Sequence, residues 1–322
     1  MSVLVYTESE EGKFKKTAFE VASYAKGVAD MLGTDVTAVS FNAQGAGDLG
    51  QYGVSKLLKV NDSKLEKFNA KAYADAIKQA AEKEGSKVII LSQSANAKYL
   101  APLLAVQLEA GYASNVVALP AGTEPLEVKR TAFTNKAFSF TKLSTDVKII
   151  GLSKNAFGLK ENQAETKEED FSPSLSEGDF SVEVVSVDKA ADKVTIADAE
   201  IVVSGGRGMK GPENWGMLEE LAETLGAATA CSKPVSDMGW RPHSEHVGQT
   251  GKPVAANLYI AVGISGAIQH LAGVSASKTK VVINNDPEAP FFKAADYGVV
   301  GDAFEIVPKL TEKLKEFKAN NS

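Results

Sequence analysis

The chain of 322 residues has 44% hydrophobic and 24% charged residues, the balance of a folded globular protein, which argues against a disordered or fibrous chain. Its length predicts about two domains. A formal net charge of -6 argues against a nucleic-acid partner, and a single cysteine, Cys231, excludes an intrachain disulfide and a multi-cysteine metal site.

No apolar run in the sequence approaches the roughly 20 residues that cross a bilayer. The first residues lead directly into an apolar run without a basic leader segment or a cleavage site. We therefore expect a cytoplasmic protein that is neither secreted nor embedded in a membrane.

The first half of the chain alternates short β-branched runs with helical patterns, which is typical of a mostly parallel sheet covered by helices. After Pro120, two runs flank a short polar turn at residues 134–136 and predict an antiparallel hairpin. Gly85 is expected to end a helix. Strands are expected at residues 3–6, 36–41, 56–60, 88–92, 115–119, 127–133 and 137–141, and helices at 17–32, 70–84 and 98–108.

Residues 160–180 are rich in glutamate and aspartate and contain Pro173 and Gly178. This composition predicts an acidic, mobile surface loop, and a docking role for its charge is a less favoured alternative. Residues 180–187 then alternate like a returning strand, and the domain boundary is expected just beyond them. The predicted domains are residues 1–190 and 197–320.

The second half repeats the α/β rhythm and predicts a Rossmann-like domain. We therefore expect an α/β fold with a mostly parallel N-terminal sheet, antiparallel additions and a C-terminal Rossmann-like domain. Strands are expected at residues 200–203, 227–230, 258–262, 280–283 and 298–300, and helices near 213–224, 265–271 and 304–317.

A glycine-rich turn follows the first strand of the second half. Gly206, Gly208 and Gly211 match the Gly-x-Gly-x-x-Gly pattern, in which glycines let the backbone approach a phosphate. A nicotinamide site also requires an acidic residue at the end of the next strand, and residues 231–233 contain none. The missing acid disfavours a dehydrogenase, and a plain structural turn remains open.

Two further loops could bind a polar ligand. Residues 247–253 read Val-Gly-Gln-Thr-Gly-Lys-Pro, and the glycine spacing and Pro253 exclude a Walker A loop. An apolar strand at 258–262 runs into small residues and a short helix over 265–270, whose amide groups would suit a pyrophosphate. An ordinary surface turn and simple strand-to-helix packing remain the alternatives for the two segments.

Other reactive side chains carry less weight. His243 and His246 are three residues apart without a third ligand, so solvent-exposed histidines are favoured over a metal site. Cys231 is expected to be a small core thiol. The sequence has no Gly-x-Ser-x-Gly elbow and no paired-carboxylate pattern, so we see no case for hydrolysis.

Taken together and in this order, several segments closely resemble the alpha-subunit family of electron-transfer flavoproteins. The most distinctive motifs are Val-Gly-Gln-Thr-Gly-Lys and Gly-Ile-Ser-Gly-Ala-Ile-Gln-His, while the first half matches mainly in rhythm and in its opening strand. The resembling segments are residues 204–208, 232–234, 247–252, 263–270, 284–290 and 295–298.

The resemblance implies an FAD-binding C-terminal domain and an N-terminal domain that packs against a beta subunit, which often carries AMP. It implies an electron carrier, without substrate chemistry of its own, that serves fatty acid beta-oxidation. Such carriers accept electrons from dehydrogenases, notably acyl-CoA dehydrogenases, and pass them to a membrane quinone reductase. No metal is implied.

The resemblance also implies a set of site residues. His270 would donate a hydrogen bond to the pyrimidine edge of the flavin, Thr250 would reach N5, and Lys233 would place a positive charge beside the ring. The residues implied to surround FAD are Arg207, Ser232, Lys233, Val247, Gly248, Gln249, Thr250, Ser265, Gly266, Ala267, Ile268, Gln269 and His270, with Asn284, Asp302 and Ala303 toward its adenosine end.

One residue departs from the family pattern. Lys233 stands where the family commonly has arginine. Lysine keeps the positive charge but lacks the planar fork and the stacking face of a guanidinium. Two alternatives to a flavin carrier remain at this stage: an NAD-dependent dehydrogenase and a flavin-free nucleotide-binding adaptor subunit.

Overall fold

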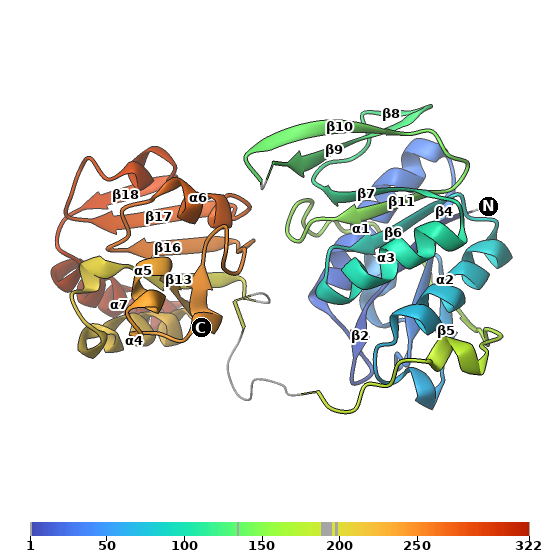
Figure 1. Ribbon diagram of the computed structural model, residues 1–322, viewed down its shortest axis with the longest axis horizontal. Coiled ribbons are helices and arrows are strands. Elements are labelled where there is room, and N and C mark those ends of the chain that lie inside the picture. The colour runs from blue at the N-terminus through green and yellow to red at the C-terminus, as the bar shows by residue number, and fades with distance from the viewer. Residues whose placement is uncertain (1, 134, 188–194, 197–198, 322) are drawn as a thin grey trace. The chain divides into compact units, whose positions relative to one another are not determined.

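The computed structural model describes residues 2–133, 135–187, 195–196 and 199–321. The chain divides into two compact units, the first comprising residues 1–133 and 137–187 and the second comprising residues 134–136 and 188–322. Unit 1 has a mostly parallel sheet with antiparallel strands, and unit 2 has a separate parallel sheet (Figure 1). The predicted fold class is therefore confirmed.

The main sheet of unit 1 is parallel from β7 to β12, and β9 pairs in antiparallel fashion with β7, β8 and β10. The antiparallel hairpin expected after Pro120 is therefore present. In spatial order the strands are β10 (Ala137–Leu143), β9 (Leu126–Ala132), β7 (Gly111–Val116), β11 (Lys148–Leu152), β6 (Val88–Ser92), β1 (Ser2–Tyr6), β4 (Asp35–Phe41), β5 (Lys56–Val60) and β12 (Lys167–Asp170), with β8 (Gly122–Thr123) beside β9 and a small pair of β2 (Ser9–Glu10) and β3 (Lys13–Phe14) apart from it.

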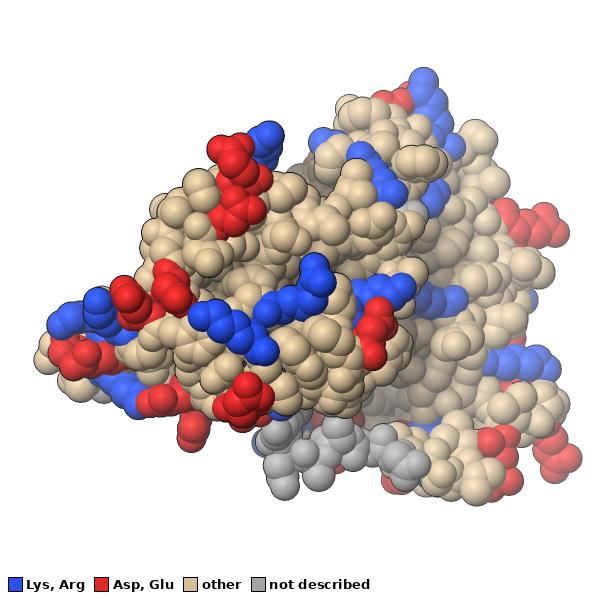
Figure 2. All heavy atoms as spheres, turned by 60° about the vertical axis from the view of Figure 1, so that its left-hand side comes forward, with Lys and Arg blue, Asp and Glu red and all other residues tan. Residues whose placement is uncertain are grey.

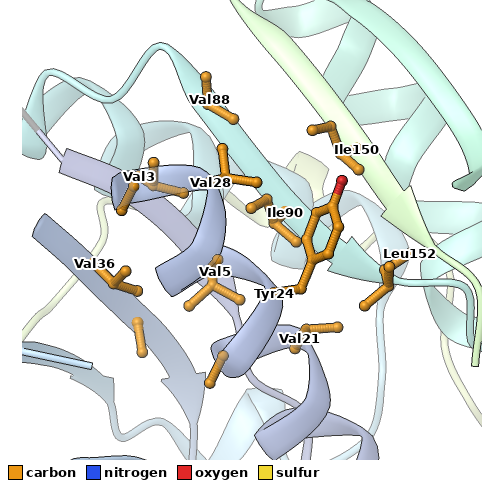
Figure 3. Close-up of a cluster of buried hydrophobic side chains, with 14 of the residues drawn as sticks. Val3, Val5, Val21, Tyr24, Val28, Val36, Val88, Ile90, Ile150 and Leu152 are labelled. Atoms are coloured by element: carbon orange, nitrogen blue, oxygen red, sulfur yellow. The ribbon is translucent and has the colours of Figure 1, made fainter. Parts of the chain in front are cut away.

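Helices cover both faces of this sheet. Because successive side chains of a strand point to opposite faces, Val3 and Val5 pack under α1 (Lys16–Leu32), whereas Leu4 joins the cluster under α2 (Ala70–Glu84) and α3 (Ala95–Gln107). Figure 3 shows the first cluster, in which the ring of Tyr24 from α1 lies against strand side chains such as Ile90, Ile150 and Leu152.

Local signals explain where two of these helices begin and end. The Asn69 side chain accepts hydrogen bonds from the first backbone amides of α2. Gly85 and Gly33 close α2 and α1 in the left-handed conformation, which glycine adopts without steric cost. The predicted role of Gly85 is thus confirmed.

Residues 160–180 are only in part the irregular acidic loop that the composition predicts. β12 lies within this segment and pairs in parallel with β5 at the edge of the sheet. Lysines of the neighbouring elements neutralise its carboxylates, with Lys56 Nζ 2.8 Å from Glu169 and Lys59 Nζ 2.9 Å from Glu168. The composition of the segment does not predict this strand, because the lysines that neutralise its carboxylates lie about a hundred residues earlier in the chain.

Two other expectations for unit 1 are wrong. Residues 180–187 contain no strand, because Phe180 ends a short 3-10 helix that starts at Glu177 and the next residues are irregular. The strand expected at 115–119 is β7, which begins earlier, at Gly111, where it pairs with β11. The domain boundary is expected just beyond residue 187, and residues 188–194 and 197–198 lie outside the described residues.

Unit 2 has an all-parallel sheet whose spatial order is β15 (His246–Val247), β14 (Ala228–Ser232), β13 (Ile201–Gly205), β16 (Leu258–Val262), β17 (Thr279–Asn284) and β18 (Tyr297–Val300). Counted along the chain from β13, this is the 3-2-1-4-5-6 order of dinucleotide-binding folds. The order reverses between β13 and β16. A ligand is expected in the crevice outside the carboxyl ends of these two strands.

The helices of unit 2 cover this sheet on both faces. α4 (Gly216–Leu225), α5 (Lys233–Asp237) and α7 (Ala303–Asn320) contribute Leu218, Val235 and Val307 to one buried cluster. α6 (Ile268–Val274) contributes Val274 to the opposite cluster, which also contains Tyr259. Both faces of the sheet are therefore buried, as expected for a parallel sheet.

Charges of both signs are present on the surface in Figure 2, where several lysine and arginine side chains lie near one another in the middle of the view. Within the described residues, no helix combines the length and apolarity that a membrane span needs.

We expect the attachment of β12 to weaken in acid. Hydrogen bonds from Lys56 and then Lys83 lower the pKa of Glu169 to about 2, below its ordinary value of roughly 4.3. The unfolded chain therefore binds this proton first, and the stabilisation is complete above about pH 4.3 and is lost as the pH falls toward 2. Glu169→Gln should lower the urea midpoint of unit 1 near pH 7, and this deficit should shrink by pH 3.

Circular dichroism can follow this unfolding. The matched control is Glu161→Gln, which changes another exposed carboxylate of the same segment and should leave the midpoint unchanged. A deficit for Glu169→Gln that stays constant with pH would show that the ion pairs do not hold the strand.

Candidate functional site

A cavity of about 530 Å³ opens at the carboxyl ends of the parallel strands of unit 2, which is within the usual range for small-molecule sites. Its walls come from the residues that follow β13, β14, β16 and β17, so it lies at the reversal point of the sheet. It is lined by Arg207, Gly208, Ser232, Lys233, Pro234, His246, Val247, Gly248, Gln249, Thr250, Gly263, Ile264, Ser265, Gly266, Ala267, Gln269, His270, Asn284 and Asp286.

The floor of the crevice depends on a close approach of two backbones. The amide of Gly206 donates to the carbonyl of Val262 at 2.8 Å, and the amide of Gly208 donates to that of Gly263 at 3.1 Å. A Cβ atom at Gly206 would lie 2.1 Å from the Gly263 carbonyl oxygen, far inside contact distance. Glycine is required here so that the loops after β13 and β16 can pack directly on each other.

The loop over residues 247–250 is held against α6. The amide of Gln249 donates to the carbonyl of Gln269 at 2.8 Å. A Cβ at Gly273 would meet Gly248 Cα at 2.5 Å, so this glycine lets the loop approach the helix. Thr250 is exposed at the end of the loop and lines the cavity.

His270 is buried, with 7% of its surface exposed. Burial is the main cause that lowers its pKa to about 4, with a further lowering from His246 and an opposing contribution from the Val247 backbone. Its Nε2 atom lies 2.9 Å from the hydroxyl of Tyr259, whereas Nδ1 is buried without a hydrogen-bond partner among the described residues. A neutral imidazole therefore borders the cavity, with one nitrogen beside Tyr259 and the Val247 backbone also close to the ring.

His246 is a cavity residue that the sequence interpretation missed. It was expected to be solvent-exposed, and this is wrong for His246, which is 2% exposed, although His243 is exposed. Burial lowers the pKa of His246, and the neighbouring His243 and Lys233 lower it further. Its position immediately before the 247–250 loop was the available signal. Within the described residues no group of histidine, cysteine and carboxylate side chains is arranged to hold a metal.

Lys233 begins α5 directly after the buried Ser232, which ends β14. Its side chain is exposed and lines the cavity, as does that of Arg207. Asp286 adds one carboxylate to the lining. The site therefore combines cations, imidazoles and backbone amides, which suits an anionic or electron-rich ligand.

The structure brings most of the predicted site residues together. Ile268, Asp302 and Ala303 are the predicted residues that do not line the cavity. The Ile268 side chain is 64% exposed, and Asp302 caps α7 by accepting from the Phe304 amide at 2.9 Å. The missed lining residues are Gly208, Pro234, His246, Gly263, Ile264 and Asp286.

The expected helix over residues 265–271 also begins later. α6 starts at Ile268, so Ser265, Gly266 and Ala267 form a loop. The backbone at Gly266 has a φ of +87° and passes so close to Phe291 that a Cβ there would lie 2.5 Å from its backbone nitrogen. The backbone of this segment therefore borders the cavity from a turn and not from the first turn of a helix.

Family models match both units. A model described as the electron transfer flavoprotein FAD-binding domain matches residues 195–275, and one described as the electron transfer flavoprotein domain matches residues 3–173. The chain belongs to the electron transfer flavoprotein alpha-subunit family. The family resemblance inferred from the sequence motifs is confirmed.

Similar proteins cover nearly the whole chain. The electron transfer flavoprotein subunit alpha of Bacillus subtilis (strain 168) is 37% identical and covers 99% of both chains. The subunit of the same name from Thermoanaerobacterium thermosaccharolyticum is 35% identical over 98% of both chains. The Protein FixB of Clostridium saccharobutylicum is 32% identical over 98% of this chain and 96% of that protein.

The residues present fit FAD on structural grounds. The cations Arg207 and Lys233 and the backbone of the turn over residues 263–266 line the cavity, and this combination suits the negative charge of a diphosphate. Buried polar atoms without partners, His246 Nδ1 and His270 Nδ1, belong to residues of the lining. Buried polar atoms are usually hydrogen-bonded, so a polar ligand is expected at this wall.

We expect Gly206→Ala to destabilise unit 2. The added methyl group would meet the Gly263 backbone, which must shift, and overpacking of this kind costs about 1–3 kcal/mol. Both tryptophans of the chain, Trp215 and Trp240, lie in unit 2, so urea unfolding followed by fluorescence measures its stability. The control is Gly216→Ala, because no atom lies within 4 Å of its added Cβ. Equal unfolding curves for the two variants would refute the close-packing requirement.

We expect the stability of unit 2 to decrease in mild acid. The folded-state pKa of His270, about 4, lies below its ordinary value of about 6.5, so the unfolded chain binds the proton first. The free energy of unfolding should fall as the pH drops from about 6.5 to 4, by up to about 1.4 kcal/mol per pH unit. His270→Gln should reduce this slope in urea titrations, and His243→Gln, at an exposed site, should not. Equal slopes in the two variants would contradict the burial effect.

Proposed function

We propose that this chain is the FAD-containing alpha subunit of an electron carrier. The observation that supports this most directly is the cavity at the reversal point of a unit that matches the FAD-binding domain of the family. Bound FAD would supply reversible electron-transfer chemistry through its isoalloxazine ring, and the protein would supply binding and electrostatics. No substrate-transforming residue is part of the proposal.

The residues would have distinct roles toward FAD. Arg207, Ser232 and the segments 247–250 and 265–270 would surround the cofactor, and Asn284 would lie toward its adenosine end together with Asp302 and Ala303. Asn284 is already oriented, since its side chain donates to the Ile264 carbonyl at 3.1 Å and accepts from the Asp286 amide at 3.0 Å.

Three side chains would tune the ring. His270 would donate to the pyrimidine edge, Thr250 would reach N5, and Lys233 would add positive charge. Donors and cations near a group that gains an electron favour its reduced form. The surroundings of His270 agree with this role. Its Nε2 atom lies within hydrogen-bond distance of the Tyr259 hydroxyl, so Nδ1 is the ring nitrogen that could donate to a ligand.

The end of β14, which borders the same cavity, argues against the alternative of an NAD-dependent dehydrogenase. The second strand, β14, ends in Ser232 and is followed by Lys233, at the place where a nicotinamide site needs a carboxylate for the ribose. A flavin-free adaptor remains the second candidate, and it is distinguished from the carrier by the absence of bound flavin.

The proposed partners follow from the family. Unit 1 would pack against a beta subunit, which would carry AMP, and two of the relatives are themselves named alpha subunits. Exposed apolar side chains on β10 and α3, such as Phe138, Phe140 and Val106, are suited to such an interface. Acyl-CoA dehydrogenases of fatty acid beta-oxidation would donate electrons, a membrane quinone reductase would accept them, and the complex would be cytoplasmic.

The direct experiment is cofactor identification. The chain is purified with any polypeptide that accompanies it, and its visible spectrum and released cofactor are recorded. A flavin spectrum with FAD released on denaturation supports the carrier, whereas a protein that stays colourless after addition of its companion chain and excess FAD supports the adaptor.

We expect Lys233→Ala to lower the reduction potential of bound FAD, because it removes a cation that lines the cavity. Lys233 is exposed, so solvent screening limits its effect to about 0.2–1 kcal/mol, which corresponds to about 10–40 mV for one electron. Spectroelectrochemical titration measures the shift. Lys233→Arg should retain the potential approximately, and Lys309→Ala, on α7 outside the lining, is the control. An unchanged potential in Lys233→Ala would remove this lysine from the tuning role.

A further inference from the structure

A completely buried tyrosine stands behind the cavity wall. Tyr259 belongs to β16 and has 0% of its surface exposed, and its ring lies parallel to that of Phe291 with centroids 6.3 Å apart. Its hydroxyl reaches α6, where it lies 2.9 Å from His270 Nε2. Tyr259 itself does not line the cavity. Its contact with the site therefore passes through His270.

The direction of this hydrogen bond can be assigned from the surroundings. Burial raises the pKa of Tyr259, so the phenol keeps its proton. Ser204 Oγ has no partner of normal geometry in the described residues, so His270 Nε2 is the acceptor available to the Tyr259 proton. The geometry favours a bond from Tyr259 to His270.

The imidazole then has one possible tautomer. A neutral histidine carries a proton on one ring nitrogen, and the hydrogen bond at one nitrogen determines which nitrogen is protonated. If Nε2 accepts from Tyr259, the proton must be on Nδ1. That atom is buried and has no hydrogen-bond partner among the described residues, although His270 lines the cavity.

We propose that Tyr259 is a positioning residue that holds His270 in the Nδ1–H tautomer, so that this cavity wall offers a hydrogen-bond donor and not an acceptor. The link to FAD rests on the proposed function, whereas the tautomer itself does not. An electron-rich carbonyl or ring nitrogen of a ligand is attracted by an N–H group and repelled by a lone pair. Tyr259 would thereby select ligands that place an acceptor at His270.

The test is nitrogen NMR of the imidazole rings in the complete chain, labelled with ¹⁵N-histidine. The chain has only three histidines, and His243→Gln and His246→Gln identify the His270 signals. In the unsubstituted chain at about pH 7, we expect Nδ1 of His270 in the range of protonated nitrogens and Nε2 in the range of unprotonated ones. The reverse pattern, or an equal mixture of tautomers, would overturn the proposal without any variant of Tyr259.

The decisive variant is Tyr259→Phe, which removes the hydroxyl and keeps the ring that packs on Phe291. We expect the Nδ1–H tautomer to lose its predominance and the Nε2 resonance to move toward the protonated range. The matched control is Tyr24→Phe, which removes a buried hydroxyl that donates to Ala118 in unit 1, and it should leave the His270 pattern unchanged. An unchanged pattern in Tyr259→Phe would also overturn the proposal.

The measurement is made without FAD and again after FAD addition, so that failures can be told apart. If the chain binds no FAD but His270 shows the expected tautomer and its loss in Tyr259→Phe, the proposed function fails and the positioning role stands. If FAD binds and the tautomer does not depend on Tyr259, the positioning role fails and the proposed function stands.

Discussion

The site depends on a contact between two stretches of main chain. The loop after β13 and the loop after β16 approach so closely that Gly206 and Gly263 have no room for a side chain between them. Both amides of the first loop, at Gly206 and Gly208, are bonded to carbonyls of the second. This approach brings the carboxyl ends of the two central strands together at the reversal point, and the cavity walls are arranged around it.

Burial determines the properties of the two histidines that line the cavity. His246 and His270 are both removed from solvent, and burial is the main cause that lowers the pKa of each. Neutral imidazoles carry one donor and one acceptor, so their hydrogen-bond partners decide what a ligand encounters. Lys233 differs because its side chain is exposed, so that water screens its interactions. The cavity is therefore bordered by imidazoles that can form hydrogen bonds, from β15 and α6, and by a lysine charge that water screens, from α5.

Both units contain a parallel sheet whose strand order reverses next to its first strand, but the space at that point is different in the two units. In unit 1, Glu8 follows β1 and accepts from Ser94 and, at 2.6 Å, from Ser92 at the end of β6, so a buried carboxylate occupies the reversal point there. In unit 2, small residues leave the corresponding place open. The shared 3-2-1-4 order of the central strands thus supports a filled crevice in one unit and a cavity in the other, because side-chain size at the strand ends differs.

The amino-acid sequence alone was enough to predict the α/β class, most strand positions and the family, because these depend on local periodicity and on motifs of consecutive residues. It also predicted most of the lining, since those motifs follow the strand ends. Only the tertiary structure showed that β12 is paired through distant lysines, that His246 is buried while His243 is exposed, and that Tyr259 contacts His270. These features arise between residues that are far apart in the chain or that differ only in the face they present, and local patterns do not encode such contacts.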